Sequence, residues 1–138
     1  MRTREDIESY LLRSNLSFKN VGAPDEADDE AMWLVRDPSS GENIVISLAG
    51  PYVLFRVKVM DLSEVEDRAS LFERLLELNA NDMVHGAYGI SDGSLVLTAA
   101  LPLENLDYNE FQGTVDDLTM ALTNHYETLA AYRTGARG

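Results

Sequence analysis

Two neighbouring residues, Asp92 and Gly93, constrain the fold of this chain more than any other feature. They separate residues 85–91 from residues 94–101, two segments with the apolar alternation of strands. A two-residue type I′ turn needs a positive φ at both positions, and Asp-Gly adopts it readily. The sequence therefore predicts a β-hairpin, and a hairpin implies an antiparallel sheet. Alternate residues of its second strand are apolar: Leu95, Leu97, Ala99 and Leu101.

Four more strands are expected before the hairpin. The candidate segments are residues 16–22, 31–36, 43–49 and 52–60, and Gly50-Pro51 separates the last two. The last two segments alternate between apolar and polar side chains, as half-buried antiparallel strands do. Tyr52, Arg56 and Lys58 share the polar side of the last one. Two cations are too few for a nucleic-acid footprint, so we expect a solvent-exposed face there.

Three helices complete the pattern, each with a start signal. Thr3 precedes the first helix, which fades near residue 15. Ser63 with Glu66, and Asp107 with Glu110, have the spacing of capping boxes at the starts of the second and third helices. The third helix carries an apolar stripe: Phe111, Val115, Leu118, Leu122, Tyr126 and Leu129.

The order of elements is helix, four strands, helix, two strands, helix. It predicts a single α+β domain over residues 1–138, an antiparallel sheet with helices on one face. The chain has 138 residues, which suits one domain better than two.

Charge narrows the choice of partners. The chain has 24 acidic and 11 basic side chains, a net charge of −13, and residues 75–132 contain no Lys or Arg. Nucleic-acid binding needs clustered cations, so direct binding to nucleic acid or anionic membrane is not expected. There is no cysteine and no apolar signal-peptide core, and we expect a cytoplasmic protein.

No pattern indicates a reaction centre. His85 and His125 lack a second histidine at ligand spacing, and each is expected to make a local hydrogen bond. The acidic run at residues 25–30 lacks the ligand positions and central glycine of a calcium loop. Gly86 and Gly89 are expected to allow close packing or a bulge in the hairpin. We therefore expect no enzyme activity, no cofactor and no metal.

Three segments resemble a known superfamily. They are residues 75–79 (Leu-Leu-Glu-Leu-Asn), residues 86–97 (Gly-Ala-Tyr-Gly-Ile-Ser-Asp-Gly-Ser-Leu-Val-Leu), and residues 101–107 (Leu-Pro-Leu-Glu-Asn-Leu-Asp) before the long helix. They resemble the type III secretion chaperone-like proteins, in particular the YbjN-like branch and the Tir/CesT chaperones. The order of elements agrees over nearly the whole chain, although more strands precede the second helix than in the usual secretion chaperone.

The resemblance implies a homodimeric α+β protein that binds other proteins without catalysing a reaction. Such proteins hold an extended client segment against apolar patches and sheet edges. Mapped onto this chain, the candidates for the dimer interface are Leu71, Phe72, Leu75 and Leu78. The candidates for client binding are Tyr10, Leu12, Trp33 and Val35. Packing in the core is the competing explanation for each of these eight residues.

Two interpretations of function stay open. The favoured one is a chaperone-like or adaptor protein whose client has a basic segment, since acidic charge steers basic partners. Such a client could itself bind nucleic acid. The alternative is a regulatory module that senses a small ligand in a pocket between the sheet and the helices.

Overall fold

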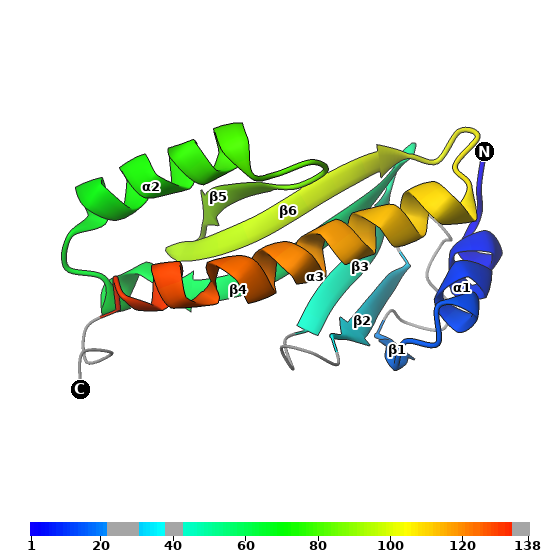
Figure 1. Cartoon of the computed structure of the whole chain (residues 1–138). Coiled ribbons are helices and arrows are strands. Elements are labelled where there is room, and N and C mark those ends of the chain that lie inside the picture. Colours follow the sequence, from blue (N-terminus) through cyan, green and yellow to red (C-terminus); the bar gives the residue numbers. More distant parts are fainter. Residues whose placement is uncertain (22–30, 38–42, 134–138) are drawn as a thin grey trace.

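The computed structural model describes residues 1–21, 31–37 and 43–133. Within these residues, an open antiparallel sheet of six strands packs with three α-helices (Figure 1). This confirms the predicted α+β class and the predicted order of elements. Along the chain the elements are α1 (Arg4–Arg13), β1 (Phe18–Asn20), β2 (Met32–Arg36), β3 (Asn43–Ala49), β4 (Tyr52–Asp61), the 3₁₀ turn η2 (Leu62–Glu64), α2 (Arg68–Asn81), β5 (Ala87–Ser91), β6 (Ser94–Pro102) and α3 (Tyr108–Ala130).

The strand order is β1-β2-β3-β4-β6-β5, and every neighbouring pair is antiparallel. The first four strands follow one another across the sheet. The predicted hairpin then joins with β6 against β4, which leaves β5 at the edge. Asp92 and Gly93 have φ values of 50° and 75°, so the turn has the two positive φ values that type I′ requires.

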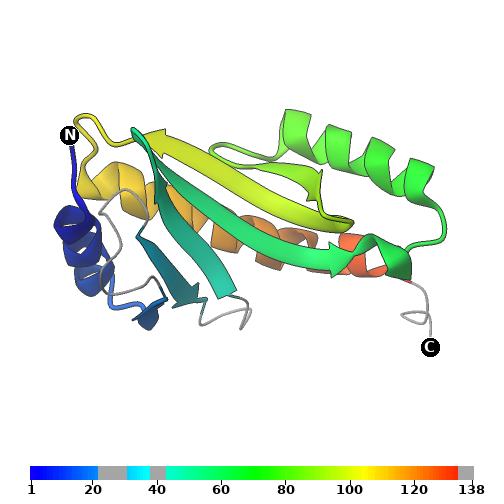
Figure 2. The same ribbon diagram turned by 180° about the vertical axis from the view of Figure 1, so that it is seen from behind.

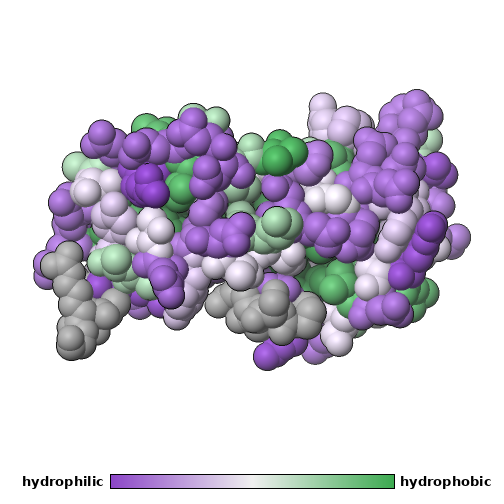
Figure 3. Space-filling model, in the orientation of Figure 1, coloured by the Kyte–Doolittle hydropathy of each residue, from purple (hydrophilic) through white to green (hydrophobic). Residues whose placement is uncertain are grey.

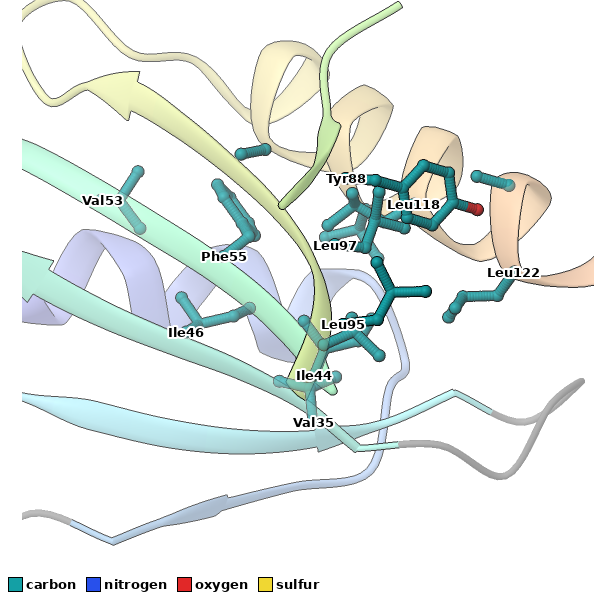
Figure 4. Close-up of a cluster of buried hydrophobic side chains, with 14 of the residues drawn as sticks. Val35, Ile44, Ile46, Val53, Phe55, Tyr88, Leu95, Leu97, Leu118 and Leu122 are labelled. Atoms are coloured by element: carbon teal, nitrogen blue, oxygen red, sulfur yellow. The ribbon is translucent and has the colours of Figure 1, made fainter. Parts of the chain in front are cut away.

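One face of the sheet is covered and the other is not. α3 crosses the front of the sheet in Figure 1, whereas the view from behind in Figure 2 shows the strands with no described helix over them. We call these two sides the covered face and the open face. Alternate strand residues fill the covered face, among them Trp33, Val35, Ile44, Ile46, Val53, Phe55, Val57, Leu95 and Leu97 (Figure 4).

α3 begins as the sequence predicts. Asp107 and Glu110 form the capping box, with the Glu110 backbone N–H donating to the Asp107 carboxylate at 2.8 Å. The predicted apolar stripe is wrong at Tyr126, which is 65% exposed, because His125 takes the buried position instead. Spacings of three and four residues from Leu118 through Leu122 and His125 to Leu129 keep the buried side chains on one face of the helix.

α2 starts later than predicted. Ser63 and Glu66 do not form a capping box; Asp67 is the N-cap, and its carboxylate accepts the Ser70 backbone N–H at 3.1 Å. The reason is Val65, which is buried and extended and pairs with Arg133 in an isolated β-bridge. The helix starts only after this residue has been placed in the core.

The free edge of the sheet at β5 is occupied by α2. The Asn79 side-chain amide donates to the Tyr88 carbonyl at 3.2 Å, and its oxygen accepts the Tyr88 N–H at 2.8 Å. Asn79 thereby satisfies the two backbone groups that an added strand would use at Tyr88. Figures 1 and 2 both show α2 running beside β5.

Gly86 confirms the expected close packing of a helix over the hairpin. A Cβ at this position would lie 2.7 Å from a Leu118 methyl of α3 and 3.1 Å from the Thr98 carbonyl oxygen. The Asp117 carboxylate also accepts the backbone N–H groups of His85 and Gly86, at 2.8 and 3.3 Å. At Gly89, in contrast, a Cβ would meet no atom within 4 Å.

Candidate protein-binding surfaces

The open face carries apolar side chains at positions where an amphipathic strand usually places polar ones. Leu34 and Val45 lie opposite each other on β2 and β3, and Met32 and Leu54 lie in the next row of the sheet, on either side of Ser47. We call Met32, Leu34, Val45 and Leu54 the open-face strip. Met32 is 39% exposed, Leu54 is 38% exposed, and the other two are half-buried. An exposed apolar cluster of this kind is typical of an interaction surface.

Basic side chains surround the open-face strip. Lys19 lies opposite Leu34, and Arg56 lies opposite Val45, so one row of the sheet reads cation, apolar, apolar, cation. Arg36 and Lys58 lie on the same face. Among the described strand residues of this face, the acid is Asp61, whose carboxylate lies 2.9 Å from the Lys58 ammonium. The strands of the open face therefore carry local positive charge, whereas the chain as a whole carries −13.

The other side of the molecule has the opposite character. α3 contains Glu110, Asp116, Asp117 and Glu127 and no Lys or Arg. Figure 3, which views the molecule from the side of α3 and α2, shows a mostly hydrophilic surface with hydrophobic side chains in small separate areas. Among the described residues, α3 therefore places negative charge on the side of the sheet that it covers, whereas the strands of the open face carry net positive charge.

A polar cluster joins buried side chains of β5 and α3 to the exposed Asp82, the C-cap residue of α2. The Tyr88 hydroxyl lies 2.7 Å from His125 Nδ1, and His125 Nε2 lies 3.2 Å from an Asp82 carboxylate oxygen. Tyr88 and His125 are 7% and 6% exposed. These partners assign the imidazole tautomer, because the Tyr88 hydroxyl can donate to Nδ1 while Nε2–H donates to the carboxylate. Figure 4 shows the Tyr88 ring near Leu118 of α3.

The protonation state of the Tyr88 phenol favours a structural role for this cluster, not a catalytic one. Burial raises the pKa of the Tyr88 phenol well above its ordinary value of 10, and the nearby Asp82 charge adds to the effect. The hydroxyl therefore stays protonated near neutral pH and serves as a donor to His125. A nucleophile or base would need the opposite shift. His85 lies outside this cluster; it is exposed, and its backbone N–H is bound by Asp117.

The structure places the four dimer-interface candidates on α2. Leu71, Leu75 and Leu78 are buried inside the single chain, as part of its core. Phe72 is half-buried and packs against that core. Leu76 was not among the candidates, yet it is 69% exposed on the same helix. The apolar surface that α2 offers to another chain therefore lies at Phe72 and Leu76.

The four client-binding candidates are spread over the two layers. Trp33 and Val35 are fully buried on the covered face, and the Trp33 indole N–H donates to Glu8 at 3.2 Å. The half-buried Tyr10 donates its hydroxyl to the Leu106 carbonyl at 2.8 Å and packs against Phe111. Leu12 is 66% exposed on α1. Of the four, Leu12 has the most surface available to a partner.

Sequence reasoning missed the open-face strip, although its signal was present. The alternation of these segments predicts one buried face and one polar face. Val45 and Leu54 occupy polar positions of that alternation. Their partners across the sheet, Met32 and Leu34, belong to a strand whose pairing only the fold reveals.

The structure also bears on a metal site, a small-ligand pocket and a membrane-spanning helix. In the described parts of the chain, no group of three or more His, Cys, Asp or Glu side chains is placed to hold a metal ion. The acidic run at residues 25–30 lies outside those parts. The space between α3 and the sheet, where a small-ligand pocket was the alternative, is occupied by buried side chains such as Phe55, Phe111 and Leu118. No helix among the described residues is long and apolar enough to cross a membrane.

The fold is that of the type III secretion chaperone-like proteins. The chain belongs to the CesT_Tir_1 family, whose pattern matches residues 1–134. This confirms the resemblance found in the sequence. No curated protein matches the chain by sequence.

Solved structures agree with the fold at low sequence identity. YbjN of E. coli is 16% identical, with 91% of this chain and 92% of that chain covered and a TM-score of 0.61. A chain of the ExsC–ExsE complex is also 16% identical, with the same coverage and a TM-score of 0.63. A chain of the heterodimeric ExoU–SpcU complex, from the type III secretion system of Pseudomonas aeruginosa, is 19% identical, with 89% and 94% covered and a TM-score of 0.60.

Proposed function

We propose that this protein is a non-catalytic, chaperone-like adaptor that acts as a single cytoplasmic domain and binds a client protein. The observation that carries the proposal is the family match over residues 1–134. Two of the similar structures, ExsC–ExsE and ExoU–SpcU, were solved as complexes with partner proteins. The exposed apolar side chains of α1 and α2, Leu12 and Leu76, give such a partner places to bind.

The proposal includes a homodimer that contacts through α2. Phe72 and the exposed Leu76 would meet their counterparts across a two-fold axis, while Leu71, Leu75 and Leu78 hold the helix on its own core. Light scattering should then give the mass of a dimer at micromolar concentration. Leu76→Glu should shift the mass toward the monomer, and Leu12→Glu on α1 is the matched control. A strict monomer for the unchanged protein would contradict the homodimer.

The client is proposed to carry a basic segment. The acid excess supports this: α3 has four acids and no Lys or Arg, so the helical side attracts cations over a distance of about a Debye length. A client of this kind could itself bind nucleic acid. Its association rate should fall as salt is raised. Association that is insensitive to salt would contradict the basic client, but not the binding of a client as such.

Affinity purification from the native organism, followed by mass spectrometry, is the direct test of client binding. The purified pair should then re-form from separately expressed proteins and co-elute in size-exclusion chromatography. The expected result is a stoichiometric complex that Leu12→Glu weakens. Failure of every recovered protein to re-form a complex would overturn the adaptor function.

A further inference from the structure

We infer that the open face of the sheet is a second docking surface, which takes an acidic, amphipathic segment of another protein. The inference goes beyond the proposed function, because it concerns a partner of the opposite charge and a different side of the molecule. It begins from the open-face strip of Met32, Leu34, Val45 and Leu54, over which no described helix lies (Figure 2).

The dimensions of the strip fit one segment of chain. Neighbouring strands lie about 4.8 Å apart, so the strip from β2 to β4 is roughly 10 Å wide. An α-helix with its side chains is about 10–12 Å across. A single amphipathic helix, or one extended segment, therefore covers the strip with its apolar side chains.

The charges around the open-face strip favour an acidic binding partner. Lys19 on β1 and Arg56 on β4 flank Leu34 and Val45 in one row of the sheet. They are three strand spacings apart, roughly 14 Å. Acidic side chains flanking the apolar stripe of the bound segment would lie within reach of both cations. Arg36 adds positive charge on the same face, whereas the Lys58 ammonium is paired with the Asp61 carboxylate at 2.9 Å.

Two other occupants fit less well. A second copy placed face to face would bring this net positive face against an identical one, which is unfavourable at a two-fold interface. A single-stranded nucleic acid uses aromatic side chains for base stacking, and the strip is aliphatic. The net charge of −13 also repels a long polyanion, whereas a peptide with a few acids is repelled much less.

The experiment uses the full chain and a synthetic amphipathic peptide in which leucines at helical spacing are flanked by glutamates. Binding is followed by fluorescence anisotropy and by the amide NMR signals of β2, β3 and β4. The double variant Lys19→Glu/Arg56→Glu should weaken binding by about tenfold or more. The matched control, Arg13→Glu/Arg74→Glu, makes the same charge change on α1 and α2 and should change the affinity by about twofold or less. Leu54→Ser should also weaken binding, which shows that charge alone is not sufficient.

Each result decides the inference. Binding of the peptide with NMR shifts on the open face, lost in the Lys19/Arg56 variant and kept in the Arg13/Arg74 variant, supports it. The inference is overturned if the peptide does not bind, or if both double variants lose affinity equally. It is also overturned if a peptide with lysines in place of the glutamates binds equally well. Tighter binding of a single-stranded oligonucleotide at physiological salt, or dimerisation that the Lys19/Arg56 variant abolishes, assigns the face to another occupant and also overturns it. None of these results depends on a client recovered from cells, so the two proposals fail separately.

Discussion

The two faces of the sheet are built from the same strands but differ in burial and in charge. On the covered face, alternate residues of β2, β3, β4 and β6 pack beneath α3 and are almost completely buried. On the open face, the intervening residues combine exposed apolar groups with cations. The comparison shows that amphipathic strands do not need a polar second face. We propose that this second apolar face binds a partner without use of the sheet edges.

The largest expected difference between the faces comes from two neighbouring residues of β4. Phe55 is 1% exposed and packs against Phe111 with ring centroids 5.5 Å apart, whereas Leu54 points to the open face. Phe55→Ala should lower the free energy of unfolding by about 3–5 kcal/mol. Leu54→Ala should lower it by about 1 kcal/mol or less. Urea denaturation measures both, and equal losses would contradict the assignment of the two faces.

Gly86 and Gly89 give the next largest difference. Gly86→Ala brings a methyl group to 2.7 Å from Leu118, a clash that should cost about 1–3 kcal/mol of stability. Gly89→Ala on the open face meets no atom within 4 Å, and it should be neutral or stabilising by up to about 1 kcal/mol. Thermal unfolding of both variants is the measurement. An unchanged melting temperature for Gly86→Ala would show that Leu118 of α3 does not pack against Gly86.

The buried Tyr88 makes a pH-dependent contribution on the covered side. Because burial raises its pKa above 10 in the folded protein, its contribution to stability is complete below pH 10 and is lost as the pH rises further. Tyr88→Phe should therefore flatten the fall of stability at alkaline pH. At neutral pH the same variant should cost about 1 kcal/mol, because His125 Nδ1 loses its donor. Unchanged alkaline denaturation would contradict the buried position of the phenol.

The smallest effect is expected on the open face, at an exposed ion pair. The hydrogen bond from Lys58, with a second from Ser94, lowers the pKa of the Asp61 carboxyl below its ordinary value of 3.8. The pair's contribution is therefore present above pH 3.8 and is lost as the pH falls below it. Lys58→Ala should raise this pKa in an NMR titration, and Arg74→Ala on α2 should not change it. No change in the Lys58 variant would show that the pair does not form in solution.

Much of the fold could be predicted because its signals are local. The Asp92-Gly93 turn needs positive φ values, and the Asp107–Glu110 capping box needs only neighbouring residues. The capping box predicted at Ser63 and Glu66 is wrong because of a non-local contact, the bridge between Val65 and Arg133. The cluster of Asp82, Tyr88 and His125 could not be predicted either, because His125 lies 37 residues from Tyr88 and 43 from Asp82 in the chain.

The candidate sites could be predicted only in part. Reasoning from apolar side chains identified residues such as Trp33 and Leu71 that the structure buries in the core of the single chain. Apolar character alone does not distinguish a core residue from a binding residue, because both avoid water. Exposure distinguishes them, and it depends on which elements pack over which face.

The sequence by itself determined the elements and their order, the antiparallel sheet and the large acid excess, since periodicity, turns, caps and composition are properties of neighbouring residues. Only the tertiary structure decided which face of that sheet is covered. It also brought Lys19, Arg36, Arg56 and Lys58 from three strands around one apolar strip, because pairing between strands, and not spacing along the chain, makes them neighbours. The net charge therefore describes the whole chain, whereas the charge that a partner meets depends on the face it approaches.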